Sequence, residues 1–86
     1  MCLGIPGKII KKWQHAHSNI PMAQVSFGGI KKDICLMFNP EAKINDYVMV
    51  HVGFAISIID EEVARQTFQF FKSEGKLAEE LSLNTK

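Results

Sequence analysis

The sequence predicts a mainly β protein, a small antiparallel barrel followed by a C-terminal helix. Short stretches in which apolar and polar residues alternate fill most of residues 3–58, as expected of half-buried strands. A glycine pair, Gly28-Gly29, separates two of these stretches, and a helical apolar pattern begins only after Asp60. A chain of 86 residues forms one small domain, and the absence of strand–helix–strand alternation argues against a parallel sheet.

The first strand is expected over residues 3–13, with an interruption near Pro6 and Gly7. The apolar residues of one parity in this stretch are Leu3, Ile5, Ile9 and Trp13. The polar residues that follow, including His15 and His17, are expected to form a surface turn. Two imidazoles at this spacing can also bind a metal ion, but no further ligand lies near them in the sequence.

Two strands, at residues 20–27 and 30–37, are expected to form a tight hairpin around Gly28-Gly29, because the primed turns require positive φ. In the second of these strands, Cys35 falls on the more polar face. It is expected to be either a partly covered small side chain or a second thiol near a metal ion or a partner.

The next expected strand, residues 47–52, has its valines at every second position, so His51 lies on the opposite face and can point outward. The valines of the first face are Val48, Val50 and Val52. Gly53 is expected to mark a bulge or a close approach of the backbone, after which residues 54–58 resume the strand pattern.

Asp60 is a good N-cap for a helix in which Ala64, Phe68 and Phe71 form an apolar row, and Gly75 is a plausible end. A neighbouring row consists of Val63, Thr67 and Phe70, and the aromatic residues are expected to close an open end of the sheet. The predicted fold is therefore a small OB-like antiparallel β-barrel with a C-terminal α-helix. Residues 1–75 are expected to form the barrel with its closing helix, and residues 76–86 a C-terminal extension or short helix.

The composition argues against several classes of protein. The net charge is +1, and the lysines form two short clusters rather than the basic stripe that is typical of a nucleic-acid-binding protein. No long apolar run predicts a membrane span, and the N-terminus lacks the pattern of a secretory signal. We therefore expect a cytoplasmic protein in which the two cysteines, Cys2 and Cys35, stay reduced.

Cys2 is the residue whose position most suggests chemistry. Methionine before a residue as small as cysteine is normally removed, so Cys2 is expected to be the mature N-terminus. Its own ammonium group would then favour the thiolate, which is the form that binds metals and attacks electrophiles. The alternative is a frayed terminus in which Cys2 is only a small apolar residue.

Two segments taken together resemble the HypC/HupF hydrogenase-maturation chaperones. Residues 1–9 (MCLGIPGKI) are similar to the opening signature of that family, and residues 46–56 (DYVMVHVGFAI) are similar to its second signature. The two segments cover roughly a quarter of the chain, and the resemblance does not extend to residues 14–45 or to the C-terminal tail.

The resemblance implies a non-enzymatic assembly protein of the [NiFe] hydrogenases. Such a protein pairs with the maturation protein HypD while the Fe(CN)2CO unit is built, and it delivers the iron to the precursor of the hydrogenase large subunit. The resemblance makes Cys2 essential to both partnerships and makes His51 an additional ligand of the transiently bound iron or a support for it. The expected partner-binding residues are Cys2, Leu3, Gly4, Ile5, Pro6, Gly7 and His51. In this interpretation, Ile5 supplies apolar contact and the glycines allow close approach.

Two other functions remain open at this stage. An OB-type nucleic-acid-binding module would use exposed aromatic residues such as Trp13, Tyr47 and Phe54 for stacking, although the weak net charge argues against it. A small thiol enzyme would use Cys2 as nucleophile and His51 as base, but no third residue that would orient the histidine is evident.

Overall fold

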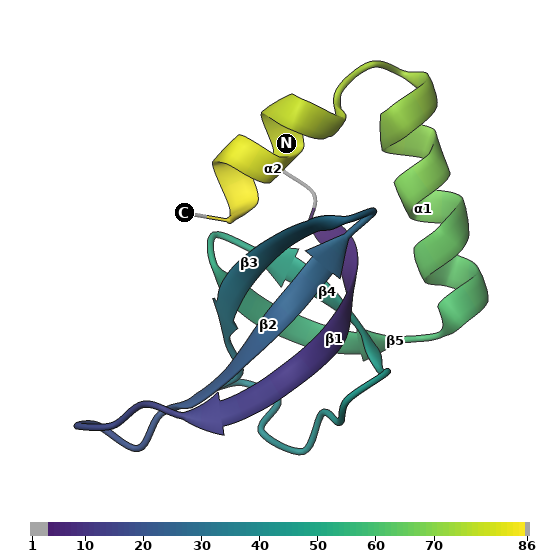
Figure 1. The fold of residues 1–86 in the computed structure, drawn as a ribbon. Coiled ribbons are helices and arrows are strands. Elements are labelled where there is room, and N and C mark those ends of the chain that lie inside the picture. The colour runs from purple at the N-terminus through teal and green to yellow at the C-terminus, as the bar shows by residue number, and fades with distance from the viewer. Residues whose placement is uncertain (1–3, 86) are drawn as a thin grey trace.

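The structure is a computed structural model that describes residues 4–85. In this part of the chain, five strands form a closed barrel and two helices pack on it. The strands follow one another around the barrel in the order β1-β2-β3-β5-β4, and β4 pairs with β1 to close it. The predicted OB-like barrel is therefore confirmed (Figure 1). The bounds of the elements are β1 Ile5–Gln14, β2 Pro21–Phe27, β3 Ile30–Cys35, β4 Tyr47–His51, β5 Phe54–Ile59, α1 Glu61–Ser73 and α2 Leu77–Asn84.

Strand β1 is long enough to pair with two neighbouring strands. Its first residues pair with β4, from Ile5 opposite Val50 to Lys8 opposite Tyr47, and most of its length pairs with β2. The expected interruption near Pro6 and Gly7 is wrong, because the strand runs through both residues. The irregularity lies instead between Ile9 and Lys11, where the register with β2 shifts by one residue and the strand can bend.

The barrel closes weakly between β3 and β5. These two strands are parallel and meet only at Cys35 and Phe54, and the Cys35 N–H donates a hydrogen bond to the Gly53 carbonyl oxygen at 2.9 Å. The other pairs of neighbouring strands are antiparallel ladders of at least four residue pairs.

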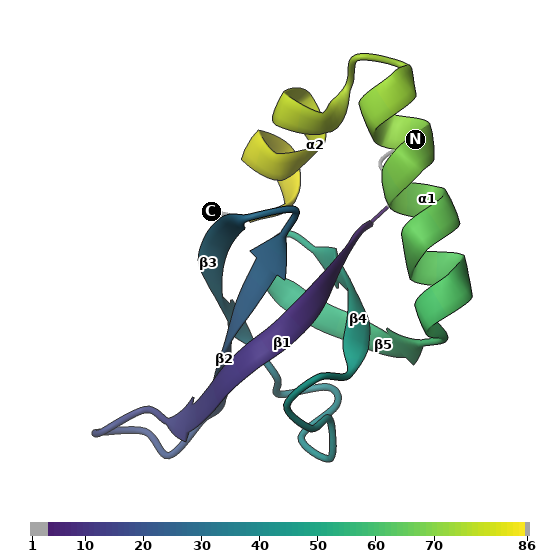
Figure 2. The same cartoon turned by 45° about the vertical axis from the view of Figure 1, so that its right-hand side comes forward.

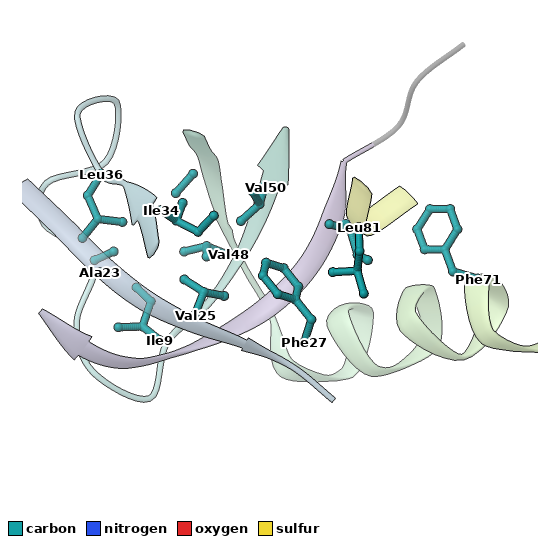
Figure 3. Packing of buried hydrophobic residues seen from close by; sticks show 13 residues of the cluster. Ile9, Ala23, Val25, Phe27, Ile34, Leu36, Val48, Val50, Phe71 and Leu81 are labelled. Atoms are coloured by element: carbon teal, nitrogen blue, oxygen red, sulfur yellow. The ribbon is translucent and has the colours of Figure 1, made fainter. Parts of the chain in front are cut away.

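The alternating pattern predicts the interior of the barrel well. The fully buried barrel residues are Ile5, Ile9, Ala23, Val25, Phe27, Ile34, Leu36, Val48, Val50 and Ala55. Phe71 of α1 and Leu81 of α2 extend this cluster at the Phe27 end, as Figure 3 shows. Trp13 and Ile30, in contrast, are largely exposed, because they lie near strand ends where the barrel no longer encloses the side chain.

Both helices pack on the barrel. Figures 1 and 2 show α1 running alongside it and α2 lying over one end, opposite the β1–β2 loop. The predicted N-cap is confirmed, since the Asp60 carboxylate accepts a hydrogen bond from the Glu62 N–H at 3.1 Å. Helix α1 ends at Ser73, and Gly75 follows with a φ of 71°, as expected of a helix stop.

The apolar rows of α1 differ in burial. Ala64 and Phe71 are buried and Phe68 is partly buried, so this row packs against the barrel as predicted. Val63 and Phe70 of the neighbouring row are exposed, because a single helix buries only one stripe against the barrel. Residues 77–84 form a short helix, one of the two alternatives expected for the extension, and Leu81 joins the core.

Candidate functional site

The two signature segments lie side by side in the barrel wall. In the antiparallel ladder between β1 and β4, Ile5 lies opposite Val50 and Pro6 lies opposite Met49. The ladder ends at this pair, so Gly4 and His51 are the next residues along the two strands. The part of the chain that leads to Cys2 thus meets the strand end that carries the histidine.

Gly4 makes a close contact that requires glycine. A Cβ atom at this position would lie 2.6 Å from Met49 Cγ and 2.9 Å from the Val50 carbonyl oxygen. Real side chains do not approach so closely, so any other residue at position 4 would push the segment away from β4. The absence of a side chain therefore fixes how near the N-terminal segment comes to the His51 end of the barrel.

Residues 5–7 anchor the segment and do not form an exposed rim. Ile5 is 0% exposed and points into the barrel, and Pro6 and Gly7 are also buried. A Cβ atom on Gly7 would lie 2.4 Å from Cγ1 of Val25, so this glycine serves internal packing. The expectation that Ile5 supplies an exposed apolar contact is wrong, because the period of the strand turns its side chain inward.

His51 is the last residue of β4 and is partly exposed. Val48 and Val50 are fully buried, so alternation along the strand places His51 and Met49 on the outer face, as the sequence predicts. Phe54 of β5 lies opposite His51, so the outer row of side chains continues from β4 onto β5. The imidazole is therefore at the surface, close to the point where the N-terminal segment enters the barrel.

Cys35 belongs to the same row of residues but lies further away. It is paired with Phe54, which is itself paired with His51, so two strand spacings separate Cys35 from His51. Two spacings correspond to about 10 Å between the backbones, so Cys35 is not a neighbour of His51. The Cys35 thiol is partly buried, and its Sγ atom accepts a hydrogen bond from the Met37 N–H at 3.4 Å. These observations favour the interpretation of Cys35 as a partly covered side chain.

The turn after His51 differs from the prediction. Val52 and Gly53 form a two-residue hairpin turn between β4 and β5, both with positive φ (52° and 83°), and Val52 is 40% exposed. The expectation that Val52 continues the inner face is therefore wrong. Of the two alternatives for Gly53, the bulge is wrong and the close approach of the backbone is confirmed by its hydrogen bonds to Asn84 and Cys35. The bulge of this strand pair lies earlier, between Met49 and Val50.

Two distant segments hold this turn. The Gly53 N–H donates a hydrogen bond to the carbonyl oxygen of Asn84, at the end of α2, and the Gly53 carbonyl oxygen accepts one from the N–H of Cys35. The sequence analysis did not identify Asn84. The signal in the sequence was Gly53, the second of two residues between two alternating stretches. This pattern indicates a hairpin turn but not the segments that bind to it.

The predicted ligand Cys2 and the predicted contact residue Leu3 lie outside the described residues. Among residues 4–85, no three histidine, cysteine, aspartate or glutamate side chains come together as a metal site would require. His15 and His17 lie exposed in the β1–β2 loop, with ring centroids 6.0 Å apart. The His15 Nδ1 atom accepts a hydrogen bond from the His17 N–H at 3.3 Å, which supports a role in the structure of the loop.

Two of the lysines on β1 have contacts within the protein. The Lys12 ammonium group donates hydrogen bonds to the carbonyl oxygens of Pro40 and Ala42, so it fastens the loop between β3 and β4 to β1. The Lys8 ammonium group lies 5.9 Å from the centroid of the Tyr47 ring. Phe54 packs against Phe38 with 5.3 Å between ring centroids. Lys12, Tyr47 and Phe54 thus already have partners within the protein.

A groove of about 320 Å³ lies between α1 and the first half of β1. Pro6, Gly7 and Lys8 of the first signature form part of its wall, together with Tyr47 of the second and Phe68 of α1. The two signatures therefore share a second surface besides the one at His51, on the side of β1 that faces α1.

Comparison with known proteins identifies the family. The model of the HupF/HypC family matches residues 1–71, which include both signatures, β1 to β5 and most of α1. The chain belongs to the HupF/HypC family. The part beyond the match contains α2.

Individual relatives agree with this result. The hydrogenase maturation factor HypC of Synechocystis sp. is 51% identical over 67 residues, which cover 78% of this chain and 88% of that protein. The hydrogenase maturation factor HybG of Escherichia coli K12 is 41% identical over 71 residues, covering 78% of this chain and 83% of that protein. The hydrogenase maturation factor HypC of Azotobacter chroococcum is 37% identical over 79 residues, covering 92% and 88% of the two chains.

These names describe maturation factors, in agreement with the prediction of a non-enzymatic protein. They give no support to the nucleic-acid-binding alternative or to the thiol enzyme. Neither helix in the described part of the chain is long and apolar enough to cross a membrane.

Proposed function

We propose that this chain is a [NiFe]-hydrogenase maturation chaperone. It pairs with a HypD-type protein while the Fe(CN)2CO unit is assembled, and it delivers the iron to the precursor of the hydrogenase large subunit. Its membership of the HupF/HypC family and the names of its relatives support the role in hydrogenase maturation. The observation that supports the finer proposal is the ladder between β1 and β4, which ends with Ile5 opposite Val50, one residue after Gly4 on the first strand and one before His51 on the other.

In the sequence, Cys2 comes two residues before Gly4, the residue that precedes the ladder between β1 and β4. We propose that the Cys2 thiolate and the His51 imidazole bind the same iron. Thiolate sulfur and imidazole nitrogen are both donors that low-spin iron(II) accepts.

Two protein ligands suit a carrier better than a resident metal site. Iron that already holds three diatomic ligands has few positions left, and a thiolate with one imidazole can fill some of them while leaving room for a donor from the next protein. A complete set of protein ligands would hold the iron too firmly for transfer. We therefore treat the iron unit as cargo that this chain passes between its partners.

The contact surface for these partners is centred on the exposed residues near His51 rather than on Ile5. Val52 follows His51 in the turn, and Phe54 is opposite His51 in the register with the exposed Phe38 packed against it. These apolar side chains next to the proposed ligand supply the contact that the buried Ile5 does not.

An infrared spectrum tests the proposal directly. The chain is purified without oxygen after co-expression with a HypD-type protein, alongside the Cys2→Ser variant. We expect bands in the cyanide and carbon monoxide stretching regions for the unaltered chain and their loss in the variant, because serine oxygen is a poor donor to this iron. Cys35→Ser is the matched control, and it should retain the bands, since Cys35 is separated from His51 by strand β5 and its Sγ atom accepts a hydrogen bond from the Met37 N–H.

Two other results would contradict parts of the proposal. Co-purification of the HypD-type protein without any bands would leave this chain as a docking protein and place the iron entirely on the partner. Failure to co-purify the partner at all would contradict the pairing itself.

A further inference from the structure

The end of helix α2 reaches the turn that follows His51. The Gly53 N–H donates a hydrogen bond to the Asn84 carbonyl oxygen, with 2.5 Å between nitrogen and oxygen. On its other side, the Gly53 carbonyl oxygen accepts the N–H of Cys35 at 2.9 Å. Both polar groups of the Gly53 backbone are therefore bound to segments outside the β4–β5 hairpin.

The end of α2 is itself firmly placed. Asn84 is 0% exposed, and its side-chain Nδ2 atom lies 3.0 Å from both the carbonyl oxygen and the Oε1 atom of Glu80. Leu81, one turn before Thr85, is buried in the core cluster, and the Thr85 N–H donates to its carbonyl oxygen at 3.0 Å. The Asn84 carbonyl oxygen is therefore a fixed acceptor, which can keep the Val52–Gly53 turn in place.

The turn needs such support because its first residue is strained. Val52 has a φ of 52°, and β-branched residues rarely adopt the left-handed region. A strained backbone of this kind persists only where the surrounding structure imposes it, and such positions are frequent at functional sites. The strained residue here comes directly after the proposed iron ligand, His51.

We propose that α2 is a clamp that holds the Val52–Gly53 turn and thereby fixes the orientation of His51, with Asn84 as the positioning residue. This inference rests on the proposed function of His51. It assigns a part in the site to residues 77–85, which lie beyond the residues that the family model matches. Residues that orient a metal ligand from outside the ligand set commonly change metal affinity by 10–100-fold when they are removed.

The test compares the full chain with a variant that lacks Asn84–Lys86 and therefore lacks the acceptor for Gly53. Hydrogen exchange of the Gly53 amide, followed by NMR on nitrogen-15-labelled protein, reports the clamp without any metal. We expect at least tenfold faster exchange in the deletion variant. Leu83→Ala is the matched control in α2, because Leu83 is exposed and its replacement keeps the Asn84 carbonyl group; it should change the exchange less than twofold.

A titration with iron(II) under anaerobic conditions then tests the effect on the site. Broadening of the His51 ring signals measures the binding, and we expect the deletion to weaken iron(II) affinity about tenfold. Adding Val52→Asn to the deletion variant should restore most of the affinity, because Asn-Gly adopts this type of turn without outside support. The titrations are made where the NMR spectrum shows every variant to be fully folded, because Val52→Asn is also expected to raise the overall stability.

The outcomes separate the clamp from the proposed function. Unchanged Gly53 exchange in the deletion variant overturns the clamp, and so does faster exchange with unchanged iron(II) affinity. If iron(II) does not broaden the His51 signals of the full chain, the ligand role of His51 fails, and the positioning role fails with it, whatever the Gly53 amide shows. If the deletion prevents folding, Asn84→Ala is measured with the same two readouts. It removes the side-chain contacts that hold the end of α2, those to Glu80 among them, so we expect faster Gly53 exchange and weaker iron(II) binding, and no change in either overturns the clamp.

Discussion

The two tight hairpins of the barrel have turns of the same backbone geometry, but one turn is stabilised by its own residues and the other by distant segments. Gly28-Gly29 joins β2 to β3 and Val52-Gly53 joins β4 to β5, and all four residues have positive φ. The first turn consists of glycines, which adopt these angles freely, and it has a local side-chain contact from the Gly29 N–H to Ser26 Oγ at 3.2 Å. The second turn contains a valine at positive φ and is bound by β3 and α2.

The difference shows how the same backbone shape can be either intrinsic or imposed. The Gly28-Gly29 turn forms from its own residues and joins two strands, which is all that its position requires. The Val52-Gly53 turn depends on contacts with residues 17 positions before it and more than 30 positions after it in the sequence. The imposed turn is the one next to the proposed iron ligand, where orientation matters for function.

The largest change in stability is expected when the Gly28-Gly29 turn is made to resemble the Val52-Gly53 turn. Gly28→Val places a β-branched residue at a φ of 62°, with its Cβ atom 2.7 Å from Cζ of Phe68. No outside contact compensates for this strain, so we expect a loss of about 3 kcal/mol in the free energy of unfolding. Denaturation with urea measures it.

Gly29→Ala serves as the control for the contact with Phe68. Its added Cβ atom meets no described atom within 4 Å, so it isolates the cost of the positive φ. It should lose less stability than Gly28→Val. A Gly28→Val variant as stable as the unaltered chain would show that this turn tolerates strain without support.

A smaller change, a gain in stability, is expected when the Val52-Gly53 turn is given residues that favour its backbone angles by themselves. Val52→Asn in the full chain gives the Asn-Gly pair that favours positive φ at both positions. Removal of the strain should raise the free energy of unfolding by about 1 kcal/mol. For a domain of this size, thermal denaturation should show an increase in Tm of about 4–8 °C. A decrease would mean that the packing of the Val52 side chain outweighs its backbone strain.

The smallest effect is expected from the local contact of the first turn. Ser26→Ala removes the acceptor for the Gly29 N–H, which is exposed and can bind water instead. We expect a change of no more than about 0.5 kcal/mol in the free energy of unfolding. A clearly larger loss on urea denaturation would show that the Gly28-Gly29 turn also depends on an added contact, and the contrast between the two hairpins would weaken.

The same contrast explains how far the sequence could predict the structure. The Gly28-Gly29 hairpin was predictable because its cause lies in the two residues themselves. The inner positions Val48 and Val50 and the outer position of His51 were predictable because alternation has a period of two. The prediction for Val52 was wrong because valine favours strands and continues the alternation, while the contacts that bend the chain there come from β3 and α2.

At the site, the sequence predicted the meeting of the two signatures only through a family resemblance. The register that joins them, Ile5 opposite Val50, is a property of the closed barrel and cannot be read from either segment alone. The exposed role expected for Ile5 was inferred from its place in a signature, although its alternation with Ile9 already indicated an inward side chain. The Asn84 contact could not be predicted, since an acceptor on the backbone leaves no trace in residue type.

The tight seat of Gly4 against β4 has a further consequence for the proposed carrier. Gly4 is seated against Met49 and Val50, the residues that lead to His51. If Cys2 and His51 both bind the iron as proposed, the second bond would form within one molecule, and a tether this short corresponds to an effective concentration on the order of millimolar, whatever the concentration of the protein. The two donors would then act as an open chelate, in which either bond can break and reform without loss of the cargo. On this proposal, a receiving protein replaces the donors one at a time and the iron need not be released into solution.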